Sequence, residues 1–434
     1  MKALQCRAAL LIATILMATA CSSLPEPGPA EARSPTRNMT AGTAHYVGGF
    51  WLVPGTAGPD ADYVRADRFS QNGVFVDSLA EPADRTVDLS GLFIIPPLAD
   101  GHNHWIEGPW TDDAAQALLE QGVFYYKNPS SPVSSTNRYR AQYDRPDTID
   151  VTFSLASLSV SGSHPEPLYQ RLAPLYNIDP EALDGEAFYD VPDVETLEAR
   201  WDTIIAAQPD FLKLIFLDIQ RESPASPATL SVAVAERAIE LAHAAGLRVS
   251  VHGVTAADFR TAAELGADDV VHLPGWELAF GLGGDHYRIT PEDAARAAQG
   301  GLMLVTTASI AAGSGDEWRN ADHPKSPLQT LQSDNLKTLR AAGLRLFIGV
   351  DTSLRPIDEV DYLRWLDFSD DASILRDWVR TGPDYIFPDR AIGRLQTGYE
   401  ASFMALPCDP FAAFDCVRDP KHLEKQGTPI GAMP

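Results

Sequence analysis

The chain has 434 residues, of which 45% are hydrophobic, and it carries a formal net charge of −25 at pH 7. This length allows one large domain and a smaller one, and the hydrophobic content is enough for a sizeable core. Because the strongly negative surface repels nucleic acid and anionic lipid, we expect no nucleic-acid partner, while the charge says little about the substrate. The sequence leaves the oligomeric state open.

The N-terminus has the features of a bacterial lipoprotein signal peptide over residues 1–21. Lys2 and Arg7 precede an apolar run, residues 8–19, that is too short to span a bilayer. The run leads into Ala-Thr-Ala before Cys21, and small residues before a cysteine resemble the site at which a signal peptidase cuts and lipid is attached. We therefore predict lipidation of Cys21. The alternative is an ordinary secretory signal in which this cysteine is incidental.

Residues 22–40 are rich in Ser, Pro, Gly and Glu, a composition typical of a flexible tether. Removing residues 1–21 takes away two positive charges and no negative one, which turns the net charge of −25 into −27. Contact with a membrane would therefore rest on the lipid anchor alone. We predict that the protein lies in the bacterial cell envelope. The residue directly after Cys21 is Ser22 and not Asp, which fits sorting to the outer membrane, facing the periplasm, if the source is Gram-negative.

Short strands are predicted next, separated by Gly, Pro, Asn and Asp, at residues 45–53, 73–79, 85–89 and 92–95. They indicate a small β unit over residues 41–97. No catalytic cluster lies within it.

Two histidines follow the last of these strands. The apolar run Leu92–Leu98 is short and contains Pro96-Pro97, so it suits a buried strand better than a helix. Side chains two apart on a strand point the same way, so His102 and His104 would project together and offer one metal ion an imidazole nitrogen each. Taken alone, the pair can equally be two surface histidines on a turn.

From about residue 98 the pattern changes to strands alternating with helices, which predicts a parallel sheet. One helix is predicted over 194–205, another ends at Gly246, and Thr255 and Thr290 have the features of helix N-caps. Together with the strand before His102, the predicted strands are 122–127, 150–160, 210–216, 247–252, 268–272, 302–307 and 344–351. Eight strand–helix repeats favour an α/β fold of the (β/α)8 TIM barrel type. A doubly wound sheet is the alternative, but its glycine-rich phosphate loop is missing from the sequence.

Four further ligand-type residues fall at the ends of predicted strands, where barrel enzymes keep their chemistry. Lys213 interrupts an apolar strand, His252 and His272 end the fifth and sixth strands, and Asp351 ends the eighth. Each residue also has an ordinary structural explanation. Lys213 could extend to water, His252 and His272 could be core histidines whose nitrogens are hydrogen-bonded, and Asp351 could cap a loop. Their occurrence at successive strand ends favours one shared site.

Strands are predicted again after about residue 388. This last segment, 389–434, also contains two cysteines. Cys6 leaves with the signal and Cys21 would be acylated, so Cys408 and Cys416 remain. Disulfides persist outside the cytoplasm, and we hypothesise a Cys408–Cys416 bridge. The alternative is two buried free thiols.

Residues Pro96 to His104 resemble the PGxxDxHxH motif of the amidohydrolase superfamily, with Pro97 where the family prefers Gly. The order of the later residues also matches: Lys after strand four, His after five and six, and Asp after eight. The stretches 246–252 and 264–272 resemble members related to imidazolonepropionase and to metal-dependent Xaa-Pro dipeptidases. The resemblance covers nearly the whole mature chain.

This resemblance implies a barrel over 98–388 inserted into a β-sandwich built from 41–97 and 389–434. It also implies two divalent metal ions, with zinc as the first choice and Mn, Co or Fe as alternatives. Carboxylated Lys213 and a hydroxide would bridge them. The implied ligands are His102, His104 and Asp351 on one ion, and His252 and His272 on the other.

The implied reaction is hydrolysis of amide or peptide-type C–N bonds in small molecules such as a dipeptide, an N-acyl amino acid or a cyclic amide. A metal-bound hydroxide would attack, and Asp351 would carry the proton to the leaving nitrogen. The same site can cleave esters, lactones or phosphotriesters. A deaminase fits less well, since deaminases usually lack the bridging Lys. An alternative from a different functional class is a surface lipoprotein that binds a metal or another ligand and catalyses no reaction.

Substrate contacts are predicted from four residues near the strand ends. His164 follows the third strand and could hydrogen-bond the substrate, although a plain loop histidine is an equal alternative. Tyr126 and Lys127 end the second strand, and Arg355 lies beyond the eighth. Lys127 or Arg355 could bind a substrate carboxylate, as a dipeptidase requires.

Overall fold

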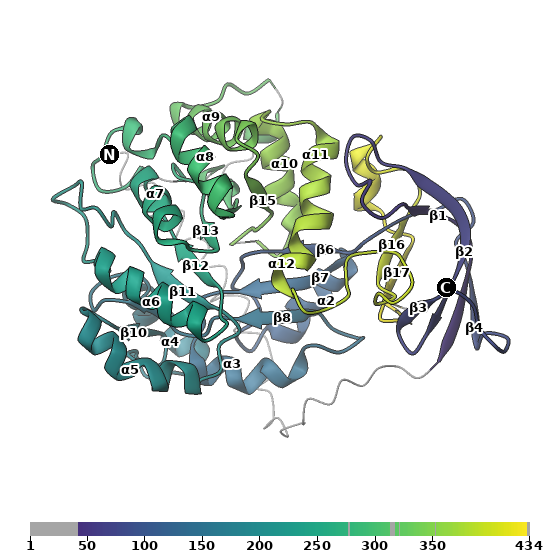
Figure 1. The fold of residues 1–434 in the computed structure, drawn as a ribbon, viewed down its shortest axis with the longest axis horizontal. Coiled ribbons are helices and arrows are strands. Elements are labelled where there is room, and N and C mark those ends of the chain that lie inside the picture. The colour runs from purple at the N-terminus through teal and green to yellow at the C-terminus, as the bar shows by residue number, and fades with distance from the viewer. Residues whose placement is uncertain (1–41, 277, 313–316, 321, 352, 432–434) are drawn as a thin grey trace.

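The computed structural model describes residues 42–431 except 277, 313–316, 321 and 352. The predicted signal peptide, the tether and Cys21 lie outside the described residues. None of the helices in the described part of the chain is both long and apolar enough to cross a membrane. A larger α/β body and a smaller body of strands lie side by side along the long axis (Figure 1).

The α/β body contains two parallel sheets. The seven-stranded sheet has the order β10-β9-β11-β12-β13-β14-β15, and the three-stranded sheet has the order β6-β7-β8. From β11 to β15, neighbouring strands follow one another in chain order, without the reversal that marks a doubly wound sheet. The strands are β6 (Leu98–Asp100), β7 (Val123–Asn128), β8 (Asp150–Phe153), β9 (Ser157–Ser159), β10 (Phe188–Asp190), β11 (Leu212–Ile215), β12 (Val249–His252), β13 (Asp269–Val271), β14 (Met303–Val305) and β15 (Arg345–Phe347).

Backbone hydrogen bonds join the two sheets where the first and eighth predicted strands meet. Gly101 N donates to Ile348 O at 2.8 Å, and Val350 N and Asp351 N donate to His102 O at 3.1 and 2.7 Å. Parallel sheets joined in this way are consistent with a (β/α)8 barrel.

The third predicted strand, 150–160, is wrong as a single element. It is divided into β8, which pairs with β7, and β9, which pairs with β10 and β11. Leu155 between them has φ +57°, in the left-handed region that a continuous strand does not enter. The turn at Leu155 therefore passes the chain from one parallel sheet to the other.

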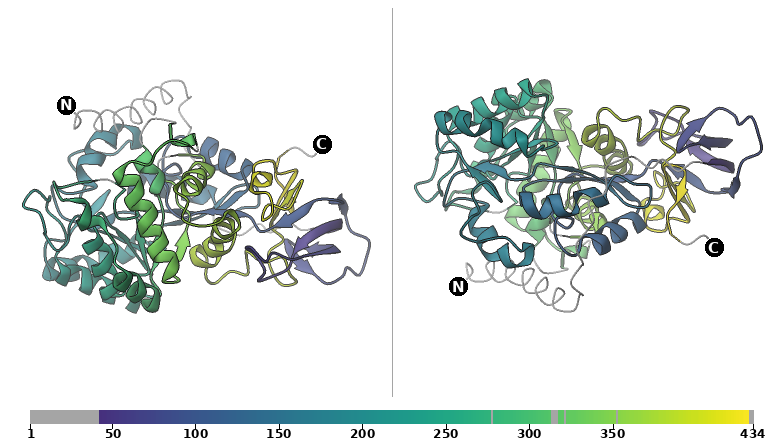
Figure 2. Two further views of the ribbon diagram at one scale, coloured as in Figure 1. Left: turned by 90° about the horizontal axis from the view of Figure 1, so that it is seen from above. Right: turned by 90° about the horizontal axis from the view of Figure 1, so that it is seen from below.

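Helices surround the parallel strands (Figures 1 and 2). Thr255 forms a capping box with Asp258, and Thr290 accepts from Asp293 N, which confirms both predicted N-caps. Gly246, just past the end of α6, has φ +77°, as a helix stop requires. The helices are α2 (Thr111–Glu120), α3 (Val133–Tyr139), α4 (Glu166–Tyr176), α5 (Val194–Ala206), α6 (Val232–Ala244), α7 (Ala256–Leu265), α8 (Pro291–Gly300), α9 (Pro327–Ala341), α10 (Pro356–Leu366), α11 (Asp371–Arg376) and α12 (Gly382–Ile386).

Both ends of the described chain contribute to one further sheet, here called the chain-end sheet. Its order is β18-β17-β16-β5-β1-β2-β3, and β4 also pairs with β1. β2 was not predicted, because its sequence is mostly polar and half-exposed. The strands are β1 (Thr43–Leu52), β2 (Tyr63–Gln71), β3 (Val74–Val76), β4 (Arg85–Asp88), β5 (Phe93–Ile95), β16 (Phe403–Leu406), β17 (His422–Lys425) and β18 (Thr428–Pro429).

The chain-end sheet curls on itself, so the described strands form one curved sheet where two stacked sheets were expected. At its β3 edge, Phe75 N donates to Tyr399 O at 2.9 Å, just before β16 begins. The curl encloses aromatic rings: Trp51 lies 5.8 Å from Phe75 and 5.2 Å from Phe403. Burial of these large rings stabilises the curved form. Beside this sheet, a disulfide joins Cys408 and Cys416, whose Cα atoms lie 5.6 Å apart.

A buried charge cluster connects the chain-end sheet to the parallel strands. Lys425 Nζ on β17 lies 2.6 Å from Asp150 Oδ1 on β8, and Arg390 lies 2.7 Å from the other oxygen. Lys425 and Asp150 are fully buried. Burial alone would raise the pKa of Asp150, but the charges of Lys425 and Arg390 hold this pKa below its ordinary value.

Lys425→Met is expected to lower the free energy of unfolding by about 3 kcal/mol, because it leaves part of a buried carboxylate without its partner. Urea denaturation measures the change. The control is Lys421→Met, which removes an exposed partner of Asp419 in the same segment and should cost less than about 0.5 kcal/mol. The contribution of the Lys425–Asp150 pair to the free energy of unfolding should be present above about pH 4 and decline as the pH falls through the lowered pKa of Asp150. Equal losses in both variants would contradict a special role for the buried cluster.

Candidate metal centre

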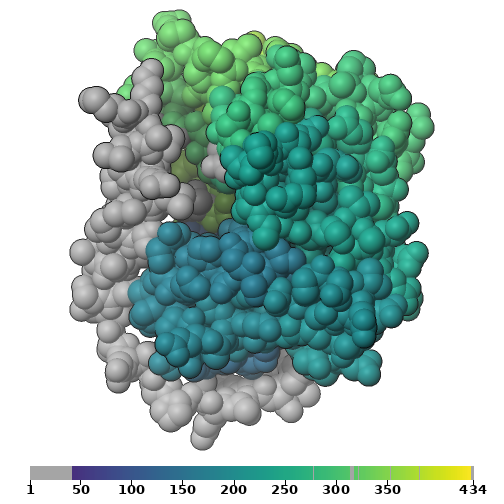
Figure 3. Space-filling view, turned by 90° about the vertical axis from the view of Figure 1, so that its left-hand side faces the viewer, coloured from purple at the N-terminus to yellow at the C-terminus, as the bar shows by residue number. Residues whose placement is uncertain are grey.

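The fold brings the predicted ligands to one end of the parallel strands. His102 and His104 follow β6, Lys213 lies within β11, and His252 ends β12. His272 and Asp351 follow β13 and β15. Since only Pro96 and Pro97 separate β5 from β6, β6 starts beside the chain-end sheet and ends away from it. Figure 3 shows this far side, where the surface is hollowed.

Asp351 faces two histidines at once. His102 Nε2 lies 3.3 Å and His104 Nε2 lies 3.4 Å from Asp351 Oδ1. Ligand atoms that share one zinc ion in tetrahedral geometry lie about 3.3–3.5 Å apart, given bonds of about 2.0–2.2 Å. The observed spacing therefore fits a shared divalent ion.

His252 and His272 complete the cluster. Their rings lie 4.5 Å apart, and the His102 ring lies 5.1 Å from the His272 ring. Ligand atoms of His102, His272 and Asp351 all lie within 4.8 Å of one another. This compact group mixes the two sets of ligands that were expected on separate ions, so the two positions must be close neighbours.

Lys213 is the unusual member of this group. Its side chain is 1% exposed, and its Nζ atom has no hydrogen-bond partner among the described residues. Burial lowers the pKa of Lys213 to about 7, although Asp269 and Asp351 oppose the shift. Only a neutral amine can react with carbon dioxide to form a carbamate, so this environment fits carboxylation of Lys213.

The histidines have the protonation state that a metal requires. Burial lowers the pKa of His104 to about 4 and lowers the pKa of His102, His252 and His272 well below the ordinary value. Imidazole is therefore neutral near pH 7, the form that ligates metal.

Two of the predicted ligands have strained backbones. His272 has φ +76° and Asp351 has φ +70°, conformations that cost of order 1–3 kcal/mol each in residues other than glycine. The Asp351 conformation is fixed by the hydrogen bond from its N to His102 O. Strain at two members of one cluster is typical of a functional site.

Sequence reasoning missed two side chains that lie behind the predicted histidine ligands. Thr307 Oγ1 lies 2.7 Å from His272 Nδ1, which leaves Nε2 of that ring to face the cluster. Glu107 Oε2 lies 3.9 Å from His104 Nδ1. Burial raises the pKa of Glu107 to about 8, against hydrogen bonds from Asn128 and Tyr176. Thr307 ends a predicted strand and could have been found by position, whereas no spacing pattern singles out Glu107.

Of the predicted substrate contacts, only His164 lies beside the cluster. Its ring stacks on His252 with centroids 5.0 Å apart. Trp276 also borders the site, 5.0 Å from the His272 ring and 6.1 Å from the His252 ring. A half-buried histidine and a half-buried tryptophan thus adjoin the histidine ligands.

The structure does not offer Tyr126 or Lys127 to a substrate. Lys127 is buried with its Nζ atom 2.5 Å from Asp269 Oδ2, so its charge is already paired. Tyr126 is fully buried and its hydroxyl accepts from Trp105 N at 3.1 Å. Both side chains point into the packed interior.

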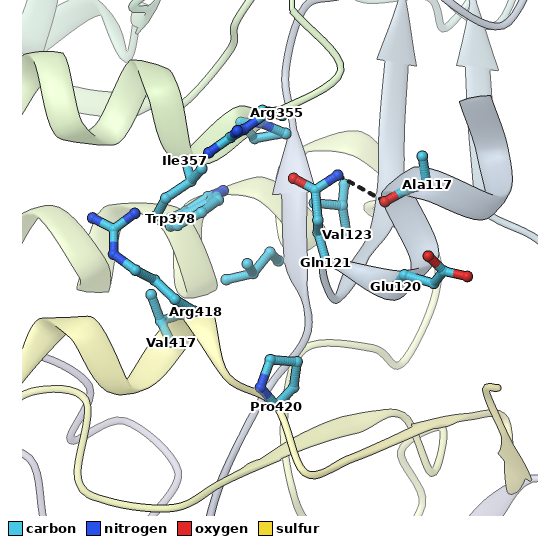
Figure 4. Close-up of a pocket in the computed structure, with 12 residues that line it drawn as sticks. Ala117, Glu120, Gln121, Val123, Arg355, Ile357, Trp378, Val417, Arg418 and Pro420 are labelled. Atoms are coloured by element: carbon cyan, nitrogen blue, oxygen red, sulfur yellow. Dashed lines mark hydrogen bonds between the residues drawn. The ribbon is translucent and has the colours of Figure 1, made fainter. Parts of the chain in front are cut away.

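Arg355 lies elsewhere. Its side chain is 66% exposed, lies 3.7 Å from Asp358, and borders a groove of about 440 Å³. Figure 4 shows Arg355, Ile357 and Trp378 on one side of this groove and Gln121 on the other. None of the six predicted ligands is among the described residues that line it.

Comparison with known proteins places the fold. No family model matches the sequence, and no curated protein matches it. Among solved structures, an amidohydrolase is similar over 90% of this chain and 100% of its own, with 15% identity and a TM-score of 0.67. An Xaa-Pro dipeptidase with bound methionine has the same coverage, 12% identity and a TM-score of 0.67. The ochratoxinase of A. niger matches over 90% of this chain and 95% of its own, with 16% identity and a TM-score of 0.66. At these identities the likeness is one of fold.

Proposed function

We propose that this chain is a metal-dependent hydrolase of the amidohydrolase superfamily that cleaves amide-type C–N bonds in small molecules. The observation that carries the proposal is the pair of imidazole nitrogens 3.3 and 3.4 Å from one Asp351 oxygen, beside a buried lysine without a partner among the described residues. Solved structures of this fold include a molinate hydrolase and a phenylurea hydrolase, whose names support hydrolysis of small molecules.

Two divalent ions would be held by the cluster. His102, His104 and Asp351 would bind one ion, His252 and His272 the other, and carboxylated Lys213 would lie between them. Zinc suits these ligands best, and Mn, Co and Fe also fit. When bound, the ions lower the pKa of water and polarise a substrate carbonyl.

Asp351 is placed to move the proton. Burial raises its pKa, against the charges of His104 and Lys213, which favours a carboxylate that accepts a proton readily. In the proposed reaction a water oxygen bonds to the carbonyl carbon, Asp351 takes the water proton, and the proton passes to the nitrogen as the C–N bond breaks. His164 would hydrogen-bond the carbonyl oxygen of the substrate.

Neither of the two cations predicted to bind a substrate carboxylate reaches the site among the described residues. Lys127 is paired with Asp269, and Arg355 lies at the separate groove, so neither offers a free charge to the site. Trp276 presents an aromatic side chain beside His272 instead. We therefore favour neutral amides over the dipeptides and N-acyl amino acids first considered. Ester, lactone or phosphotriester hydrolysis is the second candidate, because the same ligand set serves it.

The location of the protein is a separate proposal. The features of residues 1–21 support a lipid anchor at Cys21 in the bacterial cell envelope. The net charge of −25 argues against nucleic acid as a partner.

The test of the function is metal content, measured by mass spectrometry on the purified chain. Two divalent ions per chain are expected. Hydrolysis of neutral anilides should then exceed hydrolysis of N-acyl amino acids with the same acyl group. One ion would replace the two-metal proposal by a mononuclear site. No ion after reconstitution with zinc or manganese and bicarbonate would overturn the hydrolase and favour a surface lipoprotein without turnover.

A further inference from the structure

We propose that Glu107 is a positioning residue that holds His104 with Nδ1 protonated and Nε2 facing the metal site; this rests on the proposed metal centre. The His104 imidazole lies between two carboxylates. Its Nε2 atom is 3.4 Å from Asp351 Oδ1, and its Nδ1 atom is 3.9 Å from Glu107 Oε2. A carboxylate behind a histidine ligand fixes the tautomer and makes the ring a stronger donor.

Glu107 is held by side chains from separate elements. Asn128 of β7 donates to Oε2 at 2.6 Å, and Tyr176 of α4 donates to Oε1 at 3.0 Å. Ser135 of α3 donates to the Glu107 carbonyl at 2.6 Å. The carboxylate is therefore held in one orientation, with Oε2 toward His104.

Glu107 is buried without a cation beside it among the described residues. Its exposure is 0%, and within the described part of the chain no Lys or Arg forms an ion pair with it. A buried carboxylate is costly without a compensating charge. A cation bound through His104 would supply the compensating charge and favour the ionised form of Glu107.

His104 needs such support more than the other ligands. Its side chain is 31% exposed, against 3% for His102. Packing therefore restrains His104 less. The 3.9 Å separation between His104 Nδ1 and Glu107 Oε2 exceeds a hydrogen bond, so the proposed contact would form by a small rotation of the ring toward Glu107. His272 already has the corresponding contact through Thr307 at 2.7 Å.

The experiment compares the full chain with Glu107→Gln in metal affinity, by chelator competition, and in the visible spectrum after loading with Co²⁺. The amide places an NH₂ group among existing donors and removes the charge. We expect 10- to 100-fold weaker metal binding and a shifted Co²⁺ spectrum. The control is Glu424→Gln, another fully buried glutamate that accepts from a tyrosine hydroxyl but is also paired with Arg85, in the chain-end sheet. Its metal affinity and spectrum should match those of the unaltered chain.

Unchanged metal affinity and spectrum in Glu107→Gln, or an equal loss in Glu424→Gln, would overturn the positioning role. If Glu107→Gln does not fold without metal, Tyr176→Phe weakens the same orientation with the carboxylate in place, and unchanged affinity in that variant overturns the proposal. An unaltered chain that binds no metal would instead overturn the proposed function.

Discussion

Lys213→Ala is expected to abolish metal binding and nearly all hydrolysis. The buried amine has no hydrogen-bond partner among the described residues, which supports the proposal that it binds metal in carboxylated form. Alanine removes the bridging group and leaves the two metal positions without their shared ligand. Metal content and turnover, measured on the same sample, should fall together.

Chemical rescue of Lys213→Ala distinguishes loss of a metal ligand from a general loss of core packing. A short carboxylic acid such as acetate or propionate fits the space left by Lys213→Ala and supplies two oxygens in place of the carbamate, so we expect partial return of metal and activity. The control is Lys127→Met, which removes the other buried lysine of the parallel strands. It should lose stability, because Asp269 loses its charge partner, while metal content is kept. Full activity in Lys213→Ala would show that the two-metal proposal is wrong.

Asp351→Asn is expected to lower kcat by about 10²- to 10⁴-fold, the range for loss of a general base. The amide keeps the shape of the side chain but accepts no proton from water. KM should change far less, because the substrate is bound by other groups. Steady-state kinetics give both constants.

Metal analysis of the same Asp351→Asn sample distinguishes proton transfer from ligand loss. With two ions retained, the fall in kcat reports the proton-transfer role. His164→Asn is the comparison, since it removes a proposed substrate contact and should raise KM more than it lowers kcat. Turnover equal to that of the unaltered chain would remove Asp351 from proton transfer.

The ligand positions could be read from the sequence because they depend on local rules. An apolar run that ends in polar ligand-type residues marks the end of a buried strand, and parallel strands place their carboxyl ends together. His102, His252 and Asp351 were placed in this way, and the structure brings them into one cluster. The helix caps at Thr255 and Thr290 follow from equally local chemistry.

Contacts between distant segments were decided only by the tertiary structure. Lys127 ends a strand like the ligands do, but its partner, Asp269, lies 142 residues away, and nothing near Lys127 in sequence indicates that its charge is taken. The curl of the chain-end sheet likewise depends on a contact between Phe75 and Tyr399. Glu107 gained its proposed role because Asn128 and Tyr176 converge on it from other elements. Strand ends follow from backbone geometry and local hydrophobic pattern, whereas the direction and pairing of a charged side chain depend on which distant group is packed against it.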